Sequence, residues 1–149
     1  MQVEVNATIA ASPDQIWPVL IDVERWHEWT PSIISIKRLE NGRFGLGDTA
    51  RIRQPKLPEM IWRVTDFQPQ RGFVWEANSW GVLTVGEHWI TPHPTGAELL
   101  LQIRQSGRFV PIFAPWISRL ARHYMELEAQ GLKRRCEHAT AVKSSTMSS

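Results

Sequence analysis

Turn-forming residues divide the middle of this chain into short segments with the length and composition of β-strands. Such segments follow one another at residues 32–39, 49–54, 60–67, 73–78, 82–91 and 97–106. Gly, Pro, Asn and Asp separate them, for example at 69–72 and at 92–96. Because such short connections join antiparallel neighbours, the pattern predicts an antiparallel sheet.

The start of the chain adds one more strand and two short helices. Residues 2–10 alternate between apolar and polar side chains, which predicts a half-buried strand. Ser12 and Gln15 form a capping-box pattern that starts a helix, and Pro18 should keep this helix short or kinked. Asp22 can cap a second short helix. Two small helices therefore follow the first strand.

The last apolar pattern has helical spacing and extends from residue 111 to about residue 137. Ile117, Leu120, Tyr124, Leu127 and Gly131 form one stripe along it. We expect one domain over residues 1–137, closed by this long helix, and a flexible tail over residues 138–149, which contain few apolar residues.

Composition excludes several classes of protein. With 149 residues and 42% hydrophobic residues, the chain is typical of one soluble globular domain. A formal net charge of +2 is too small to indicate a nucleic-acid binder, and no apolar run is long enough to indicate an integral membrane protein. The only cysteine is Cys136, and no signal peptide is recognisable, so we expect a cytoplasmic protein without a disulfide. We expect no metal and no cofactor, and the sequence leaves the oligomeric state open.

The predicted sheet is much wider than the predicted helix. A seven-stranded sheet is about 29 Å across, whereas a helix with its side chains covers only about 10 to 12 Å. If the sheet curls around the helix, its interior is not fully covered, and a small ligand could occupy the remaining space. Large aromatic side chains such as Trp62 and Trp75 could fill that space instead.

Several short motifs accompany this order of elements. They are Ala11–Trp17, Asp22–Trp29, Trp62–Pro69, Phe73–Trp75, Gly86–His88 and Gly131–Lys133. With these motifs, residues 2–137 resemble the START-like or SRPBCC superfamily, in particular its polyketide cyclase/dehydrase-like branch. The resemblance implies an α+β helix-grip fold, in which a curved seven-stranded antiparallel sheet surrounds a long C-terminal helix. It also implies an internal site for a small hydrophobic molecule of polyketide, lipid or aromatic type.

Candidate site residues follow from strand parity, helical spacing and this resemblance. The expected apolar ligand contacts are Trp62, Phe73, Trp75, Leu99, Leu101, Leu120, Tyr124 and Leu127. His88 and Gln105 are the expected polar anchors, and His88 is also the candidate catalytic residue. Glu87 should point to the opposite face of the strand, so a Glu87–His88 dyad is not expected.

The register of the 82–91 strand is left open by its sequence. Leu83, Val85 and Trp89 compete for the buried face with the set that contains His88, and a bulge at Gly86 could switch the alternation midway. The direction in which His88 points depends on this register.

Three functions are compatible with these observations. The first is binding of a small hydrophobic ligand inside the domain. The second is a cyclase or dehydratase reaction in which His88 transfers a proton. The third is a protein-interaction module with a filled core, in which exposed Trp26 and Trp29 would form the partner surface.

Overall fold

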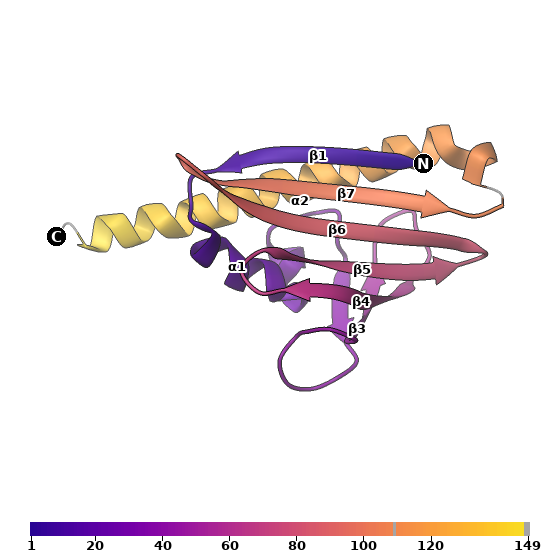
Figure 1. The fold of residues 1–149 in the computed structure, drawn as a ribbon, viewed down its shortest axis with the longest axis horizontal. Helices are drawn as coiled ribbons and strands as arrows, with labels where there is room; N and C mark the ends of the chain where they lie inside the picture. Colours follow the sequence, from indigo (N-terminus) through magenta and orange to yellow (C-terminus); the bar gives the residue numbers. More distant parts are fainter. Residues whose placement is uncertain (109, 148–149) are drawn as a thin grey trace.

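Seven antiparallel strands form one curved sheet, and its concave face carries the helices (Figure 1). The computed structural model describes residues 1–108 and 110–147. The elements are β1 (Gln2–Ile9), α1 (Pro13–Ile21), the 3-10 helix η1 (Val23–Glu28), β2 (Ser35–Arg38), β3 (Thr49–Arg53), β4 (Met60–Gln68), β5 (Gly72–Ser79), β6 (Val82–His93), β7 (Gly96–Ser106) and α2 (Val110–Met147). The strand order is β1-β7-β6-β5-β4-β3-β2, so the first and last strands in sequence are neighbours. The predicted α+β helix-grip fold is confirmed.

The capping signals at the start of the chain had different outcomes. The Ser12 side chain accepts from the backbone N–H of Gln15, and the Gln15 side chain accepts from the backbone N–H of Ser12, so the capping box is confirmed. α1 contains Pro18 and has only nine residues. The cap predicted at Asp22 is wrong, because the Asp22 side chain makes no capping hydrogen bond to η1.

The pairing of β6 settles its register. The concave face of β6 carries Thr84, Gly86, His88 and Ile90, which are all buried. Gly86 pairs with Trp75 on one side and with Ile103 on the other without a break, so the bulge expected there is absent. The only register shift between β4 and β5 lies between Val64 and Asp66. A β-carbon on Gly86 would be 3.3 Å from the Trp75 ring, so this glycine makes room for an indole.

The long helix extends farther than the apolar pattern indicated. α2 runs from Val110 to Met147, past the expected end at about residue 137, and its final part extends beyond the strands in Figure 1. Of the expected tail, residues 138–147 are helical and residues 148–149 lie outside the described part of the chain. The helix packs mainly on β1, β7 and α1, at one side of the curved sheet. The strands from β6 to β3 therefore need another cover.

Candidate functional site

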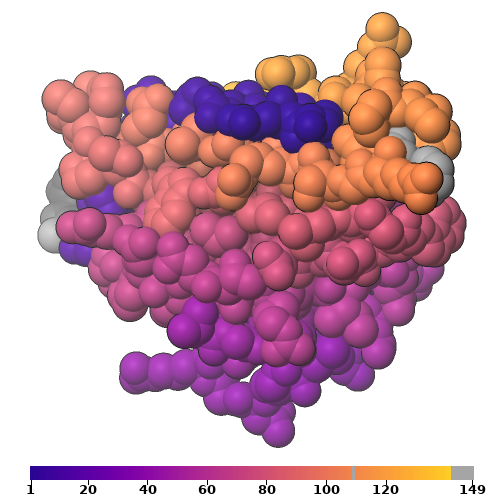
Figure 2. Space-filling view, turned by 45° about the vertical axis from the view of Figure 1, so that its right-hand side comes forward, coloured from indigo at the N-terminus to yellow at the C-terminus, as the bar shows by residue number. Residues whose placement is uncertain are grey.

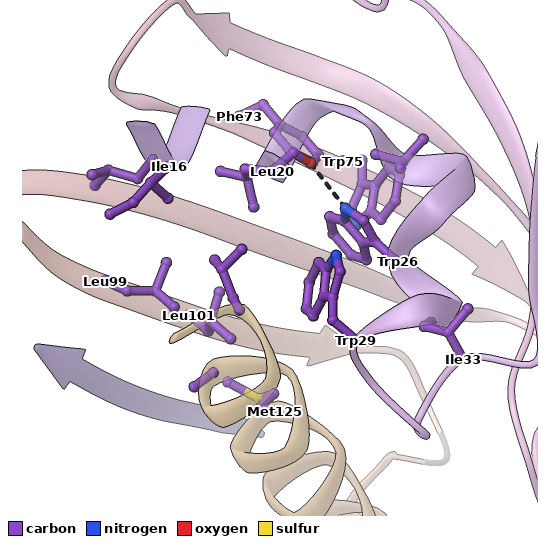
Figure 3. Close-up of a cluster of buried hydrophobic side chains, with 14 of the residues drawn as sticks. Ile16, Leu20, Trp26, Trp29, Ile33, Phe73, Trp75, Leu99, Leu101 and Met125 are labelled. Atoms are coloured by element: carbon purple, nitrogen blue, oxygen red, sulfur yellow. Dashed lines mark hydrogen bonds between the residues drawn. The ribbon is translucent and has the colours of Figure 1, made fainter. Parts of the chain in front are cut away.

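Aromatic side chains from η1 supply that cover. Alternation along β5 and β6 directs Phe73, Trp75 and His88 to the concave face, and Trp26 descends onto them from η1 (Figure 3). The ring centroid of Trp26 lies 5.4 Å from that of Trp75 and 5.4 Å from that of His88. Phe44, between β2 and β3, adds a further ring 5.2 Å from Phe73. The space over Phe73 and Trp75, where we expected an open cavity, is filled.

Trp26 holds this arrangement together. Its indole Nε1 donates to the carbonyl oxygen of Leu20 at 2.9 Å, within a side chain that is only 2% exposed. That carbonyl belongs to the last turn of α1, where carbonyl groups have no partner inside the helix. Trp29 is also buried, at 9% exposed. The alternative of a partner surface at Trp26 and Trp29 required both side chains to be exposed, and their burial contradicts it.

His88 lies within the aromatic cluster as a neutral ring. It is 5% exposed and stacks on Phe73 at a centroid distance of 4.5 Å. Its Nδ1 lies 3.3 Å from the carbonyl oxygen of Phe73, which can only accept, so Nδ1 carries the proton and Nε2 the lone pair. Burial lowers the pKa of His88 to about 4. Glu87 points to the other face and pairs with Arg104 at 3.2 Å, so no Glu87–His88 dyad forms. The catalytic role of His88 stays a prediction.

A second group of site residues forms a row across the sheet, nearer the start of α2. Gln105 on β7 pairs with Thr84 on β6, which pairs with Ala77 on β5. On β4, Arg63 pairs with Glu76 of β5, so the preceding residue, Trp62, lies beside Ala77 in the same register. Two small side chains thus separate the amide of Gln105 from the indole of Trp62. We call Trp62, Ala77, Thr84 and Gln105 the small-residue row.

The two ends of the small-residue row carry polar atoms without partners. The Gln105 Nε2 donates to the Thr84 Oγ1 at 3.1 Å, but the Gln105 Oε1 is buried and accepts no hydrogen bond from residues 1–108 and 110–147. The Nε1 of Trp62 is likewise buried and has no acceptor among the described residues. A buried polar atom without a partner costs about 1 to 3 kcal/mol, and such atoms are rare unless water or a ligand completes them.

The predicted helical residues lie in two environments. Tyr124 is buried, and its hydroxyl donates to the carbonyl oxygen of Pro55, which joins α2 to the β3–β4 connection. Leu120 and Leu127 are half-buried and are not part of the packed core. On the sheet, Leu99 is fully buried and Leu101 is 3% exposed, both near Met125 of α2 in Figure 3. Whether any of these side chains contacts a ligand stays a prediction.

Glu128 is a residue that the sequence analysis missed. It lies one turn after Tyr124 on α2, and its carboxyl contacts the hydroxyl of Ser32. Ser32 is fully buried and shares a hydrogen bond of 2.7 Å with the hydroxyl of Thr30. Burial raises the pKa of Glu128 to about 7, against the smaller, opposite effect of the bond from Ser32. One sequence signal could have identified Glu128: it is an acidic residue one turn after Tyr124, on a mostly apolar stripe of the helix.

Glu128 should make the stability of this protein depend on pH. Between pH 4.5 and about 7 the unfolded chain loses the Glu128 proton while the folded chain keeps it, so stability falls as pH rises and levels off above 7. We expect Glu128→Gln to remove this pH dependence, which amounts to a change of up to about 3 kcal/mol in the free energy of unfolding. Urea denaturation of both proteins between pH 5 and 8 measures it.

The matched control for this experiment is Glu126→Gln, which changes an exposed glutamate on the same helix. It should keep the wild-type slope. Equal slopes for wild type and Glu128→Gln would mean that the Glu128 carboxyl is hydrated in the folded protein.

Two hollows formed by described residues are open to solvent. One of about 700 Å³ is lined by Glu28, Trp29, Gly131, Arg134, Arg135, Glu137 and His138. Another of about 380 Å³ is lined by Met1, Gln2, Leu83, Val85, Arg104, Gln105 and Ser106. Leu83 and Val85 lie on the opposite face of β6 from Thr84, so this hollow lies mainly outside the concave face. Within the described part of the chain, no group of His, Cys, Asp and Glu is placed to hold a metal ion. None of the described helices is both long and apolar enough to span a membrane.

Comparisons with known proteins agree with this fold. The sequence profile of a family described as "Polyketide cyclase / dehydrase and lipid transport" matches residues 1–137. No curated protein sequence matches the chain. Among solved structures, a START superfamily protein from Mycobacterium smegmatis is similar, with a TM-score of 0.76 and 20% identity over 93% of this chain and 98% of that one.

Two further solved structures have the same fold. A protein from Thermus thermophilus gives a TM-score of 0.76 and 14% identity, over 93% of this chain and 99% of that one. The di-domain ARO/CYC StfQ from the steffimycin biosynthetic pathway gives a TM-score of 0.76 and 13% identity. The similarity covers 94% of this chain and 51% of StfQ, so this chain spans about half of that protein.

Proposed function

This chain belongs to the polyketide cyclase / dehydrase and lipid transport family, and we propose that it binds a small hydrophobic molecule between the small-residue row and α2. The filled aromatic cluster around Trp26 forms the floor of this site rather than its cavity. The small side chains of Ala77 and Thr84 lie in the row itself. The ligand therefore sits nearer the start of α2 than the expected contacts at Phe73 and Trp75 indicated.

The two unpartnered polar atoms carry this proposal. Among the described residues, the Trp62 Nε1 is a donor without an acceptor, and the Gln105 Oε1 is an acceptor without a donor. A hydroxyl group both donates and accepts, and a molecule with a carbonyl and a hydroxyl serves both ends of the row. The ligand class we propose is thus mostly apolar, with one or two such oxygens, as in phenols and hydroxyketones.

The first half of α2 supplies the opposite wall of the proposed site. Leu120 and Leu127 are half-buried but stand outside the packed core, so they have apolar surface left to cover. Tyr124, bound to the carbonyl of Pro55, marks the point where the helix is fastened to the rest of the domain. We propose that a ligand enters on the N-terminal side of this fastening and packs against Leu120.

Binding of 1-naphthol, with 1-methylnaphthalene as a probe of similar shape without the hydroxyl, tests the proposal. We expect the wild type to prefer 1-naphthol by about fivefold to tenfold, because each hydrogen bond contributes about 1 kcal/mol. Trp62→Phe and Gln105→Met should each reduce that preference. Isothermal titration calorimetry and native mass spectrometry measure it.

Outward-facing residues of the same types are the controls. Trp89→Phe changes an indole that donates to Glu87, and Gln102→Met changes an amide on the other face of β7. Both should keep the wild-type preference. If neither probe binds, or if all four variants bind alike, the site does not lie at the small-residue row.

A cyclase or dehydratase reaction at His88 is the second candidate, because the family description includes such enzymes. The hydrogen bond from Nδ1 to the Phe73 carbonyl keeps the neutral ring in one tautomer. In that tautomer, Nε2 can accept a proton. Its low pKa makes it a weak base at neutral pH. A His88→Gln variant that still bound ligand and still converted it would remove His88 from this mechanism.

A further inference from the structure

The start of α2 exposes apolar side chains that the ligand site does not use. Ile112 is 69% exposed, Phe113 is 55% exposed and Trp116 is 57% exposed. Three large apolar side chains within five successive residues form a contiguous patch, which is unusual on the surface of a monomeric soluble domain. In Figure 2 this orange segment stands at the upper right corner of the molecule.

A fourth exposed large apolar residue lies at the same end of the domain. Trp80, in the β5–β6 turn, is 88% exposed. Its neighbour Gly81 touches the junction of β7 and α2, where a β-carbon on Gly107 would be 2.5 Å from the Gly81 carbonyl oxygen. The turn with Trp80 and the start of α2 are thus adjacent. We call Trp80, Ile112, Phe113 and Trp116 the aromatic tip.

The two segments that form the aromatic tip carry charge of one sign. Residues 107–125 contain Arg108, Arg119 and Arg122, all exposed, and no Asp or Glu. Residues 77–86, which include the turn with Trp80, also lack acidic side chains. All charged side chains of these two segments are therefore basic, although the net charge of the whole chain is only +2.

From this combination we propose that the aromatic tip docks onto the surface of an anionic phospholipid bilayer. Tryptophan and phenylalanine prefer the boundary between headgroups and acyl chains, and arginine pairs with lipid phosphates. The apolar side chains lie on a helix end and a turn that protrude together, so they can insert together into the headgroup region of a bilayer. The proposal is independent of the ligand proposal, because none of the tip residues belongs to the small-residue row.

Vesicle co-sedimentation tests the docking. We expect the wild type to bind vesicles of phosphatidylcholine with 30% phosphatidylglycerol at least about tenfold more strongly than vesicles of phosphatidylcholine alone, with binding that weakens as salt rises. The double variant Phe113→Ser with Trp116→Ser should reduce binding to the anionic vesicles about tenfold or more. Arg119→Gln should reduce it by less and should weaken its salt dependence.

The control is Leu46→Ser, which removes an equally exposed apolar side chain from the β2–β3 connection, away from the aromatic tip. It should bind as the wild type does, and circular dichroism should show all variants folded. The absence of wild-type binding, or equal loss in Leu46→Ser and the double variant, would overturn the proposal. So would size-exclusion chromatography with light scattering that shows a dimer lost only in the double variant, since the tip would then bind a second copy.

Binding of 1-naphthol should be unchanged in the double variant, so the two proposals fail separately.

Discussion

Trp26→Ala is expected to lower the free energy of unfolding by about 4 kcal/mol, the largest loss that we expect from a single substitution in this protein. Trp26 is 2% exposed and has the rings of Trp29, Phe73, Trp75 and His88 around it. Truncation leaves a ring-sized void among side chains that other contacts hold in place. It also removes the donor to the Leu20 carbonyl, which then stays buried without a partner.

The void should accept a small aromatic molecule. Apolar cavities of this size in protein cores stay dry and bind aromatic compounds, so indole should restore part of the lost stability of Trp26→Ala and should not stabilise the wild type. Thermal unfolding followed by circular dichroism, with and without indole, measures both effects.

The control for this substitution is Trp80→Ala, which removes an indole that is 88% exposed and should leave the unfolding temperature almost unchanged. A loss below about 1 kcal/mol in Trp26→Ala would mean that the cluster is loosely packed. The cavity we expected in the sequence analysis would then lie around Trp26 after all.

The strands and the long helix were predictable because their signals are local. Leu99, Leu101 and Ile103 share one face of the last strand, while Glu98, Gln102 and Arg104 share the other. The structure buries Leu99 and Leu101. The capping box of Ser12 and Gln15 involves only neighbouring residues. Where the local pattern was ambiguous, as around Gly86, only the pairing of β6 with both neighbours decided which face is buried.

The side chains that fill the concave face were not predictable, because they depend on how the short segment with Trp26 and Trp29 packs against the sheet. The sheet is wider than α2 alone, but the rings of Trp26 and Trp29 cover strands that α2 leaves bare. Nothing in the spacing of these tryptophans distinguishes an exposed corner from a core. Glu128 was missed for the same reason, since its burial depends on the approach of α2 to Ser32.

The candidate site was predictable in part. Inward parity was expected for Gln105, and the structure places it opposite Thr84 in register. Trp62 was expected as an apolar contact, and its buried Nε1, which has no acceptor among the described residues, is why we propose a polar contact there as well. Unpartnered atoms are a property of the packed structure, and no sequence pattern reports them.

The close approach of α2 to residues 29–32 depends on Gly131, and replacing this glycine should be strongly destabilising. A β-carbon at this position would be 1.9 Å from the carbonyl oxygen of Trp29 and 3.1 Å from its ring. The contact is with backbone, so no side chain can move away to relieve it, and the helix would have to shift. In an ordinary helix Gly→Ala gains about 1 kcal/mol, so the sign of the effect is diagnostic.

We expect Gly131→Ala to lower the free energy of unfolding by about 2 to 3 kcal/mol, which corresponds to roughly 5 to 10 °C in the unfolding temperature of a domain of this size. Because the helix must move away from Trp29, the carboxyl of Glu128 should become hydrated, and the variant should lose the fall in stability between pH 5 and 8. The matched control is Gly45→Ala, where an added β-carbon meets nothing within 4 Å and stability should hold or rise slightly. If Gly131→Ala instead stabilised the protein and kept its pH dependence, α2 would not be held against Trp29, and the floor of the proposed site would lose its support.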